Sequence, residues 1–127
     1  MQEPTFLVLT ALTGEPLHGY GILQQVTALS GGTVVLGAGT LYGALDRLTE
    51  QGLIAVEREE AVDGRLRRYY RLTDEGAGRL AAEVERLRRN ANAAAAGLRR
   101  RTALPGTLGT PAAPGVAGVA GLQAGLA

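Results

Sequence analysis

The segment that most constrains the fold is a short amphipathic helix pattern that stops at a glycine and leads straight into a β-hairpin pattern. Its apolar positions recur at helical spacing and form one stripe, made of Leu41, Leu45 and Leu48. Gly52 stands where a left-handed residue is expected to end the helix. Asp63-Gly64 is typical of the turn that joins two hairpin strands. A chain with this order of elements is expected to place a helix beside a hairpin.

Helical patterns flank this segment on both sides. We expect helices over 4–12, 17–30 and from about 39, an extended piece at 33–36, a strand over 53–59, and a long helix over 74–101. Thr73 is the expected N-cap of the long helix. The predicted fold class is mainly α with a small β-hairpin: a winged helix-turn-helix followed by a long C-terminal dimerisation helix.

The hairpin is acidic in its first half and basic in its second half. The acids are Glu57, Glu59 and Glu60, and the arginines are Arg65, Arg67, Arg68 and Arg71. The formal net charge of the chain is only +1, so the basic character is local. A basic strand directly after a helix-turn-helix favours double-stranded DNA as a partner. The predicted DNA-binding residues are Thr40, Tyr42, Ala44, Arg47, Arg65, Arg67 and Arg68.

The long helix carries an unbroken apolar stripe with a period of about 3.5 residues, which is typical of a coiled coil. The stripe consists of Ala77, Leu80, Val84, Leu87, Ala91, Ala94 and Leu98. The rest of the chain offers no obvious face to cover it, so we expect a homodimer in which the first helix also packs on the partner. The predicted dimer interface comprises Phe6, Leu9, Leu80, Val84, Leu87, Ala91 and Leu98.

These patterns divide the chain into three parts. We expect a DNA-binding domain over 1–72, a dimerisation helix over 73–101 and a disordered tail of Gly, Ala and Pro over 102–127. The N-terminus lacks a basic stretch before its apolar run, and no apolar stretch is long enough to span a membrane. The sequence therefore predicts a cytoplasmic protein with no membrane partner.

Five short motifs stand in order along the chain. They are His18-Gly19-Tyr20-Gly21-Ile22, Gly39-Thr40-Leu41-Tyr42, Arg47-Leu48, Gly52-Leu53-Ile54 and the run from Gly64 to Gly76. Over roughly residues 3–90 they resemble the PadR family of bacterial transcriptional regulators, although many relatives carry proline at the position of Gly43. The resemblance implies a repressor that binds an operator. It also places Tyr20 at the start of the helix that crosses the DNA backbone, where Tyr20 either contacts a phosphate or belongs to the core.

Some members of that family bind planar aromatic compounds by stacking them on tryptophan. This chain contains no Trp, so we expect no such stacking site. The residues do not identify a small-molecule inducer. The role of Tyr42 stays open between a phosphate contact and packing against the wing. Tyr69 and Tyr70 should point to opposite faces of their strand, one into the core and one into solvent.

Residues 34–39 support a second interpretation, the glycine-rich turn of a dinucleotide-binding enzyme. The fit is poor, because the third glycine of that fingerprint falls at Tyr42 and a hairpin follows in place of a parallel strand. A third interpretation is a winged helix used only for protein–protein contact. The single histidine, His18, is expected to have a structural role. No acid–base or nucleophile constellation is visible and the chain lacks Cys, so we predict a non-enzyme without metal or cofactor.

Overall fold

The computed structural model describes residues 1–103 of the 127-residue chain. The elements follow in the order α1 (Glu3–Ala11), β1 (Leu17–His18), α2 (Gly19–Leu29), α3 (Ala38–Glu50), β2 (Ile54–Val62), β3 (Arg65–Leu72) and α4 (Asp74–Ala103). This order confirms the predicted mainly α fold with a hairpin. The predicted tail starts too early, because Thr102 and Ala103 still belong to α4, and its remaining residues 104–127 lie outside the described part.

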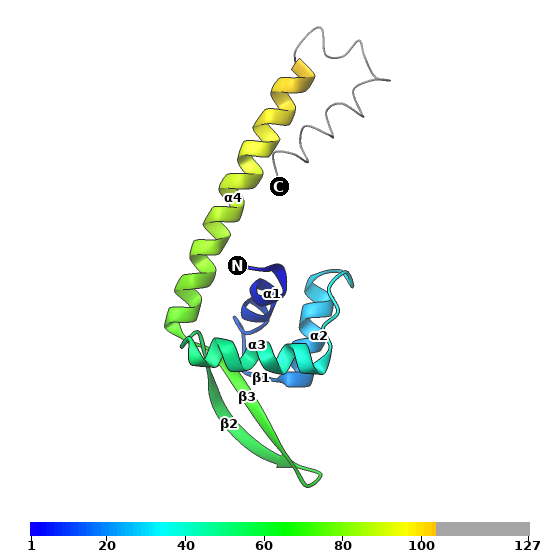
Figure 1. The fold of residues 1–127 in the computed structure, drawn as a ribbon, viewed down its shortest axis with the longest axis vertical. Helices are drawn as coiled ribbons and strands as arrows, with labels where there is room; N and C mark the ends of the chain where they lie inside the picture. The colour runs from blue at the N-terminus through cyan, green and yellow to red at the C-terminus, as the bar shows by residue number, and fades with distance from the viewer. Residues whose placement is uncertain (104–127) are drawn as a thin grey trace. The chain divides into compact units, whose positions relative to one another are not determined.

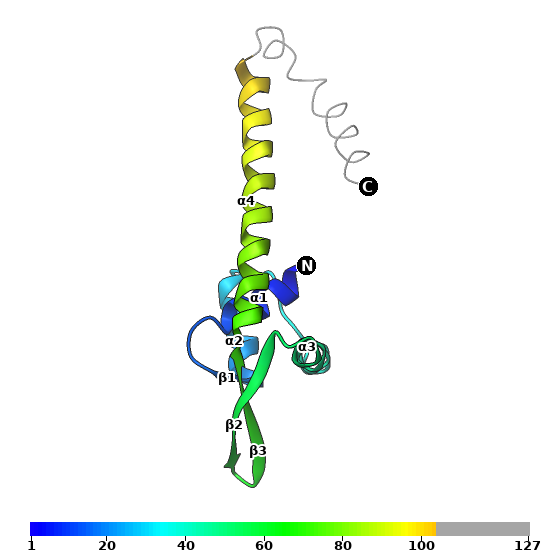
Figure 2. The same cartoon turned by 90° about the vertical axis from the view of Figure 1, so that its left-hand side faces the viewer.

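The chain groups into two compact units, Met1–Arg86 and a second one that begins at Leu87. The first unit contains α1, α2, α3, the sheet and the start of α4. Within this unit, the hairpin of β2 and β3 extends away from the three N-terminal helices (Figure 1). Figure 2 shows α3 end-on beside the base of the same hairpin.

The core of the first unit is built from α1, α2, α3 and the base of the sheet. Its fully buried side chains are Val8, Leu9, Leu12, Ile22, Val26, Leu41, Leu45, Leu53 and Ile54. The predicted stripe of α3 is confirmed, because Leu41, Leu45 and Leu48 are all buried. The prediction that Leu9 contacts a partner subunit is wrong, because its side chain is 0% exposed within its own subunit. Phe6 is partly buried against the same core.

The sheet has three antiparallel strands in the order β1-β3-β2. β1 consists of Leu17 and His18, which pair with Tyr70 and Tyr69. The sequence placed these two residues at the start of the second helix, but α2 begins only at Gly19. A strand of two residues is too short to show alternation, so only its pairing partner defines it.

A β-bulge changes the course of the hairpin. The register of β2 and β3 shifts between Val56 and Arg58, which leaves Glu57 as the extra residue. On one side of the bulge Val56 lies opposite Tyr70, and on the other side Arg58 lies opposite Tyr69. Simple alternation would put Arg58 on the same face as Val56. The bulge instead turns Arg58 to the outer face of the sheet.

The hairpin turn forms where the sequence predicted it. Asp63 and Gly64 both have positive φ angles, 51° and 76°. Two consecutive residues in this conformation give the mirror-image turn whose twist matches that of paired strands. Gly52, with φ 77°, ends α3 as expected.

The start of α4 is in close contact with the end of α3 and the start of β2. The Thr73 hydroxyl oxygen accepts a hydrogen bond from the backbone N–H of Gly76 at 3.0 Å, which confirms the predicted N-cap. The same hydroxyl donates to the carbonyl oxygen of Gly52 at 2.7 Å. Gly76 lies so close to the carbonyl oxygen of Leu53 that a Cβ at this position would collide with it. A larger residue than glycine would therefore push α4 away from β2.

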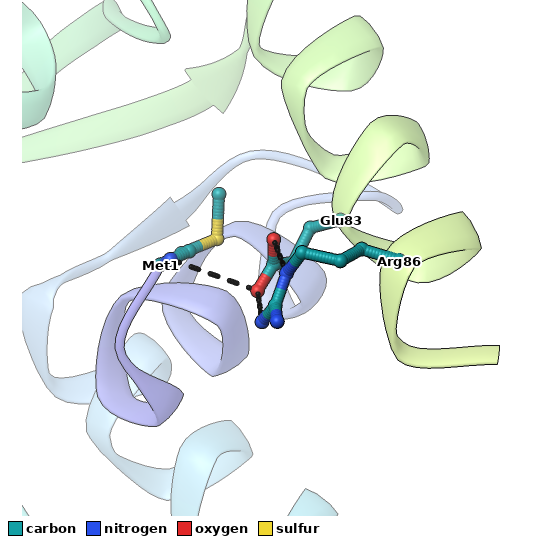
Figure 3. Close-up of polar contacts among 3 residues, drawn as sticks. All are labelled: Met1, Glu83 and Arg86. Carbon is teal, nitrogen blue, oxygen red and sulfur yellow. Dashed lines mark hydrogen bonds and ion pairs between the residues drawn. The ribbon is translucent and has the colours of Figure 1, made fainter. Parts of the chain in front are cut away.

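α4 also buries a charged side chain, Glu83, against the first unit, where 9% of its surface is exposed. Its carboxylate accepts hydrogen bonds of 2.6 and 3.0 Å from the Arg86 guanidinium and lies 3.7 Å from the amino group of Met1 (Figure 3). The hydrogen bonds from Arg86 hold the pKa of Glu83 below its ordinary value of 4.5. The buried carboxylate is therefore stabilised in its charged form.

The apolar stripe of α4 is divided between buried and exposed positions. Leu80 is 8% exposed and belongs to the core of the first unit, so the prediction that it lacks a partner in its own chain is wrong. Val84 is partly buried. Leu87 and Leu98 are 40% and 61% exposed, and Ala91 is also exposed. These last three positions keep the surface that a second subunit would need.

Candidate nucleic-acid interface

A hollow of about 1000 Å³ lies between the start of α2, the outer face of α3 and the hairpin. It is lined by His18, Gly19, Tyr20, Tyr42, Asp46, Val62, Asp63, Arg65, Leu66, Arg67, Arg68 and Tyr70. The predicted DNA-binding residues in this lining are Tyr20, Tyr42, Arg65, Arg67 and Arg68. Three elements that are far apart in the sequence thus bring them to one surface.

The solvent-facing side of α3 carries the predicted residues Thr40, Tyr42 and Arg47, all of them exposed. Ala44 differs from the prediction: it is 8% exposed and lies on the buried side of the helix, so its side chain has no surface to offer a base. Asp46 lines the hollow but was not predicted. It stands four residues after Tyr42 and so shares its helix face, a spacing that the sequence already contains.

Tyr42 packs against the first residue of α2. A Cβ at Gly19 would collide with the Tyr42 hydroxyl, so only glycine leaves room for the ring. Tyr42 nevertheless keeps 48% of its surface exposed. The contact with α2 was not among the roles expected for Tyr42, because a tyrosine that packs on a glycine in another helix leaves no local pattern in the sequence.

Exposed ion pairs divide the hairpin arginines into two groups. Arg71 lies 3.2 Å from Glu57, and Arg68 lies 3.7 Å from Glu59. Within the described residues, Arg65 and Arg67 have no carboxylate within ion-pair distance. Both guanidinium groups line the hollow outside any ion pair, because Glu60, the acid across from Arg67, is paired with Arg58. A planar guanidinium is well suited to bind phosphate.

A third pair, Arg58 with Glu60 at 2.8 Å, stands on the outer face of the sheet beside Tyr69. The Arg58 guanidinium lies 3.9 Å from the centroid of the Tyr69 ring, and the ring centroid of His18 is 5.3 Å from the same point. Burial in this cluster, followed by the positive charge of Arg67, lowers the pKa of His18 from its ordinary value of 6.5. His18 makes no capping hydrogen bond, and its packing on Tyr69 agrees with the expected structural role.

The structure shows which of the tyrosines with an undecided role are buried and which are exposed. Tyr20 is 63% exposed, so it does not belong to the core. Tyr70 is 5% exposed and is the core member of the adjacent pair. The other member of the pair, Tyr69, should then be exposed, but it is partly buried below Arg58. The bulge that brings Arg58 over this ring explains the difference.

The surface offers cations and hydroxyl groups, which are the groups that contact phosphate in protein–DNA complexes. The dinucleotide-binding interpretation needs a strand before its glycine turn, but residues 34–37 form no regular structure. Within residues 1–103, no cluster of His, Cys, Asp and Glu could hold a metal ion. No helix of the same range is both long and apolar enough to cross a membrane.

Comparison of the sequence with curated proteins and family models gives two matches. The model described as "Transcriptional regulator PadR-like family" matches residues 8–82. A 37.1 kDa protein in transposon TN4556 of Streptomyces fradiae is 46% identical over 52 residues, which are 41% of this chain. The chain spans only 14% of the length of that relative.

Solved structures with the same fold include several regulators of this family. One from Eggerthella lenta is 31% identical with a TM-score of 0.62, and the match covers 74% of this chain and 80% of that one. One from Clostridium difficile is 27% identical with a TM-score of 0.64, and covers 76% and 99%. Bacillus subtilis PadR in complex with operator DNA is 24% identical with a TM-score of 0.59, covers 65% and 48%, and is similar in fold.

The family match and the fold lead to the same conclusion. The family model covers more than half of the chain, and its residues include α2, α3 and the hairpin that surround the hollow. Members of the family are transcriptional regulators and not enzymes. The chain therefore belongs to the PadR-like family of transcriptional regulators.

Proposed function

We propose that this regulator binds a double-stranded DNA operator in a sequence-specific manner, as a homodimer, and represses the genes beside it. The observation that carries the proposal is the hollow between α3 and the hairpin, which contains the unpaired cations Arg65 and Arg67. The complex of Bacillus subtilis PadR with operator DNA supports it by fold similarity.

In the proposed complex, α3 enters the major groove and the hairpin holds the adjacent backbone. Thr40 and Arg47 are exposed on α3, and Arg47 has no ion-pair partner among the described residues. Arg47 is therefore free to reach a base edge or a phosphate. Tyr42 and Tyr20 contribute hydroxyl groups beside the start of α2, where they can donate to phosphate oxygens.

The proposed dimer forms through the exposed part of the apolar stripe of α4, with residues 1–72 as the DNA-binding domain and α4 as the dimerisation helix. Leu87, Ala91 and Leu98 supply its seam, and the proposed interface also includes Val84 and Phe6, both partly buried. A two-fold dimer presents two copies of α3 to a pseudo-palindromic site, with half-sites about one helical turn or a multiple apart.

The test compares two arginines of one strand that differ in pairing. Arg67 and Arg71 stand four residues apart on β3, so they share a face of the strand. Only Arg71 forms an ion pair, because Glu60, which lies across from Arg67, is paired with Arg58. Arg67→Ala should weaken binding to all duplexes alike and should lower the slope of log affinity against log salt by about one unit per copy. Arg71→Ala is the matched control and should change the slope much less.

The measurement is a salt titration of binding by fluorescence anisotropy, with a duplex from the promoter region of the protein's own gene. An unchanged slope for Arg67→Ala would show that the hairpin does not contact phosphate. If the wild-type protein binds no duplex at low salt and excess protein, the winged helix serves protein–protein contact and the proposed function is wrong.

A further inference from the structure

His18 is the last residue of β1 and the only histidine of the chain. Its cross-strand partner is Tyr69, so the two side chains lie on the same face of the sheet. The imidazole is half-buried and lines the hollow between α3 and the hairpin. Neither ring nitrogen forms a hydrogen bond with the described residues, and no polar side-chain atom buried among them lacks a partner. The ring nitrogens are therefore open to a ligand in the hollow.

Two strands bring charges close to this imidazole. Arg67 of β3 stands two residues before Tyr69 and so shares its face, and its positive charge acts against protonation of His18. Glu60, across from Arg67 on β2, favours protonation, but it is itself paired with Arg58 at 2.8 Å. His18 and Arg67 thus stand close enough to repel one another once the imidazole is protonated.

The helices and the hairpin turn supply the other polar groups near the ring. Tyr20 of α2 has its ring centroid 6.5 Å from that of His18, and Tyr42 of α3 lines the same hollow. Two carboxylates, of Asp46 on α3 and Asp63 in the turn, belong to the lining as well. Tyrosine hydroxyls donate to phosphate oxygens in protein–DNA complexes. An anion in the hollow is therefore attracted by the hydroxyls, the imidazole and the hairpin arginines, and opposed by these two acids.

Proton binding by His18 depends on whether an anion lies beside it. In the free subunit burial, followed by the charge of Arg67, lowers the pKa of His18 below its ordinary value of 6.5, so the imidazole is neutral at neutral pH. A phosphate bound to the Arg67 guanidinium offsets the repulsion from Arg67 and adds a negative charge beside the ring. Both changes favour the imidazolium and raise the pKa of His18 in the complex.

We propose that His18 donates a hydrogen bond to the operator phosphate that Arg67 binds, and takes up one proton per subunit when the DNA binds. The proposal rests on the DNA-binding function proposed above. A charged donor binds phosphate more strongly than a neutral one. Affinity for the operator therefore rises as the pH falls, which makes this regulator sensitive to acidity.

The first experiment measures affinity by fluorescence anisotropy between about pH 8 and about pH 5.5, in buffers that contain no phosphate. The duplex is one that the wild-type protein selects from a randomised pool. Between the pKa of His18 in the free protein and that in the complex, affinity should rise by up to about tenfold per subunit for each pH unit of acidification. The salt slope should be steeper at the acid end by about one unit per subunit, because the imidazolium adds one cation to the contact.

The matched variants separate the proton from the hydrogen bond. His18→Gln keeps a hydrogen-bond donor but does not titrate, so its affinity should be close to that of wild type at the alkaline end and should not rise in acid. Tyr20→Phe removes a hydroxyl beside the same ring. It is the control, because it should weaken binding by the same factor at every pH and keep the full pH dependence. Circular-dichroism melts establish that each variant is folded.

The second experiment observes the imidazole of the wild-type protein directly. The untagged chain has one histidine, so an NMR titration gives the pKa of His18 with and without operator duplex. We expect a pKa below 6.5 in the free protein and a higher one in the complex. This measurement needs no substitution, so it decides the question even if a variant fails to fold.

The outcomes distinguish this inference from the function on which it rests. If the wild-type protein binds no duplex at any pH, the proposed function itself is wrong. If it binds with an affinity that does not change with pH, or if His18→Gln retains the pH dependence, the proton-linked contact alone is wrong. A pKa of His18 that operator DNA leaves unchanged would overturn the contact in the same way.

Discussion

The part of α4 up to Arg86 and the part that begins at Leu87 share one apolar period in the sequence, but their side chains differ in exposure. In the first part Leu80 is 8% exposed and belongs to the core of its unit. In the second part Leu87 and Leu98 are 40% and 61% exposed. The period indicates that a face of the helix is covered, but it does not show whether the subunit itself or a partner covers it.

The buried positions of α4 explain why the stripe divides. They are Gly76, Leu80 and Glu83, spaced by four and three residues like the predicted stripe, with which they share only Leu80. Successive residues of a helix are rotated by about 100°, so two neighbouring stripes overlap on its surface. The stripe that is buried in the subunit contains Gly76 and the ion-paired Glu83. Neither residue is hydrophobic, so a hydrophobicity pattern does not predict that they are buried.

The largest expected effect comes from charging the buried part. Leu80→Asp places a carboxylate in the core, where an uncompensated charge is strongly unfavourable, and even truncation of such a leucine costs about 2–5 kcal/mol. We expect the variant to lose its cooperative thermal transition, measured by circular dichroism, at every protein concentration. A folded variant with a wild-type melting temperature would contradict the placement of Leu80 in the core.

A leucine-to-aspartate substitution in the exposed part of α4 should disrupt assembly of the dimer but not folding of the subunit. Leu87→Asp puts a charge in the proposed dimer seam but leaves the core of the first unit intact. We expect a folded monomer by light scattering, with DNA affinity lower by about 100-fold or more, since one subunit then binds without the other. A wild-type protein that is itself a folded monomer at micromolar concentration would contradict the proposed dimer. Loss of folding in Leu87→Asp would contradict the division of α4.

The smallest effect concerns the charged residue in the buried part of the helix. The pKa of Glu83 lies below 4.5 in the folded protein, because Arg86 donates hydrogen bonds to its carboxylate. A depressed pKa contributes stability above the unfolded-state value, and this contribution is lost as the pH falls through the folded-state value. Glu83→Gln should therefore lower the melting temperature at neutral pH.

This difference from wild type should disappear in acid, where the wild-type carboxylate is protonated too. Thermal melts at a series of pH values test the effect, with Glu15→Gln as a control, since Glu15 is an exposed glutamate in the loop between α1 and β1. A difference that stays constant down to acid pH would mean that Glu83 acts by packing and not by charge.

Several local features of the fold could be predicted because their causes are local. The Leu41–Leu45–Leu48 stripe, the stop at Gly52 and the N-cap at Thr73 each depend on side chains within one or two turns of helix. The turn at Asp63-Gly64 depends on two adjacent residues.

The candidate site was predictable only in part, for the same reason. Alternation and charge located Arg65 and Arg67, but nothing near Arg68 or Arg71 indicated that each of them forms an ion pair with an acid of β2. Helical spacing placed Thr40 and Arg47 off the buried stripe of α3, and both are exposed. It placed Ala44 there too, but Ala44 is buried. Alanine is common on both the buried and the exposed side of a helix, so the residue type at this position did not show on which side it lies.

By itself, the sequence determined the order of the four helices and the hairpin, the C-terminal end of α3 and the hairpin turn, since local periodicity and backbone preference set these features. Only the tertiary structure decided that Leu17 and His18 form a strand, that the bulge at Glu57 turns Arg58 onto Tyr69, and that α4 buries Leu80 with Glu83. Each of these depends on contacts between segments far apart in the chain. Such contacts form where the packing and hydrogen bonding of the whole unit are most favourable. The sequence of a single segment does not determine them.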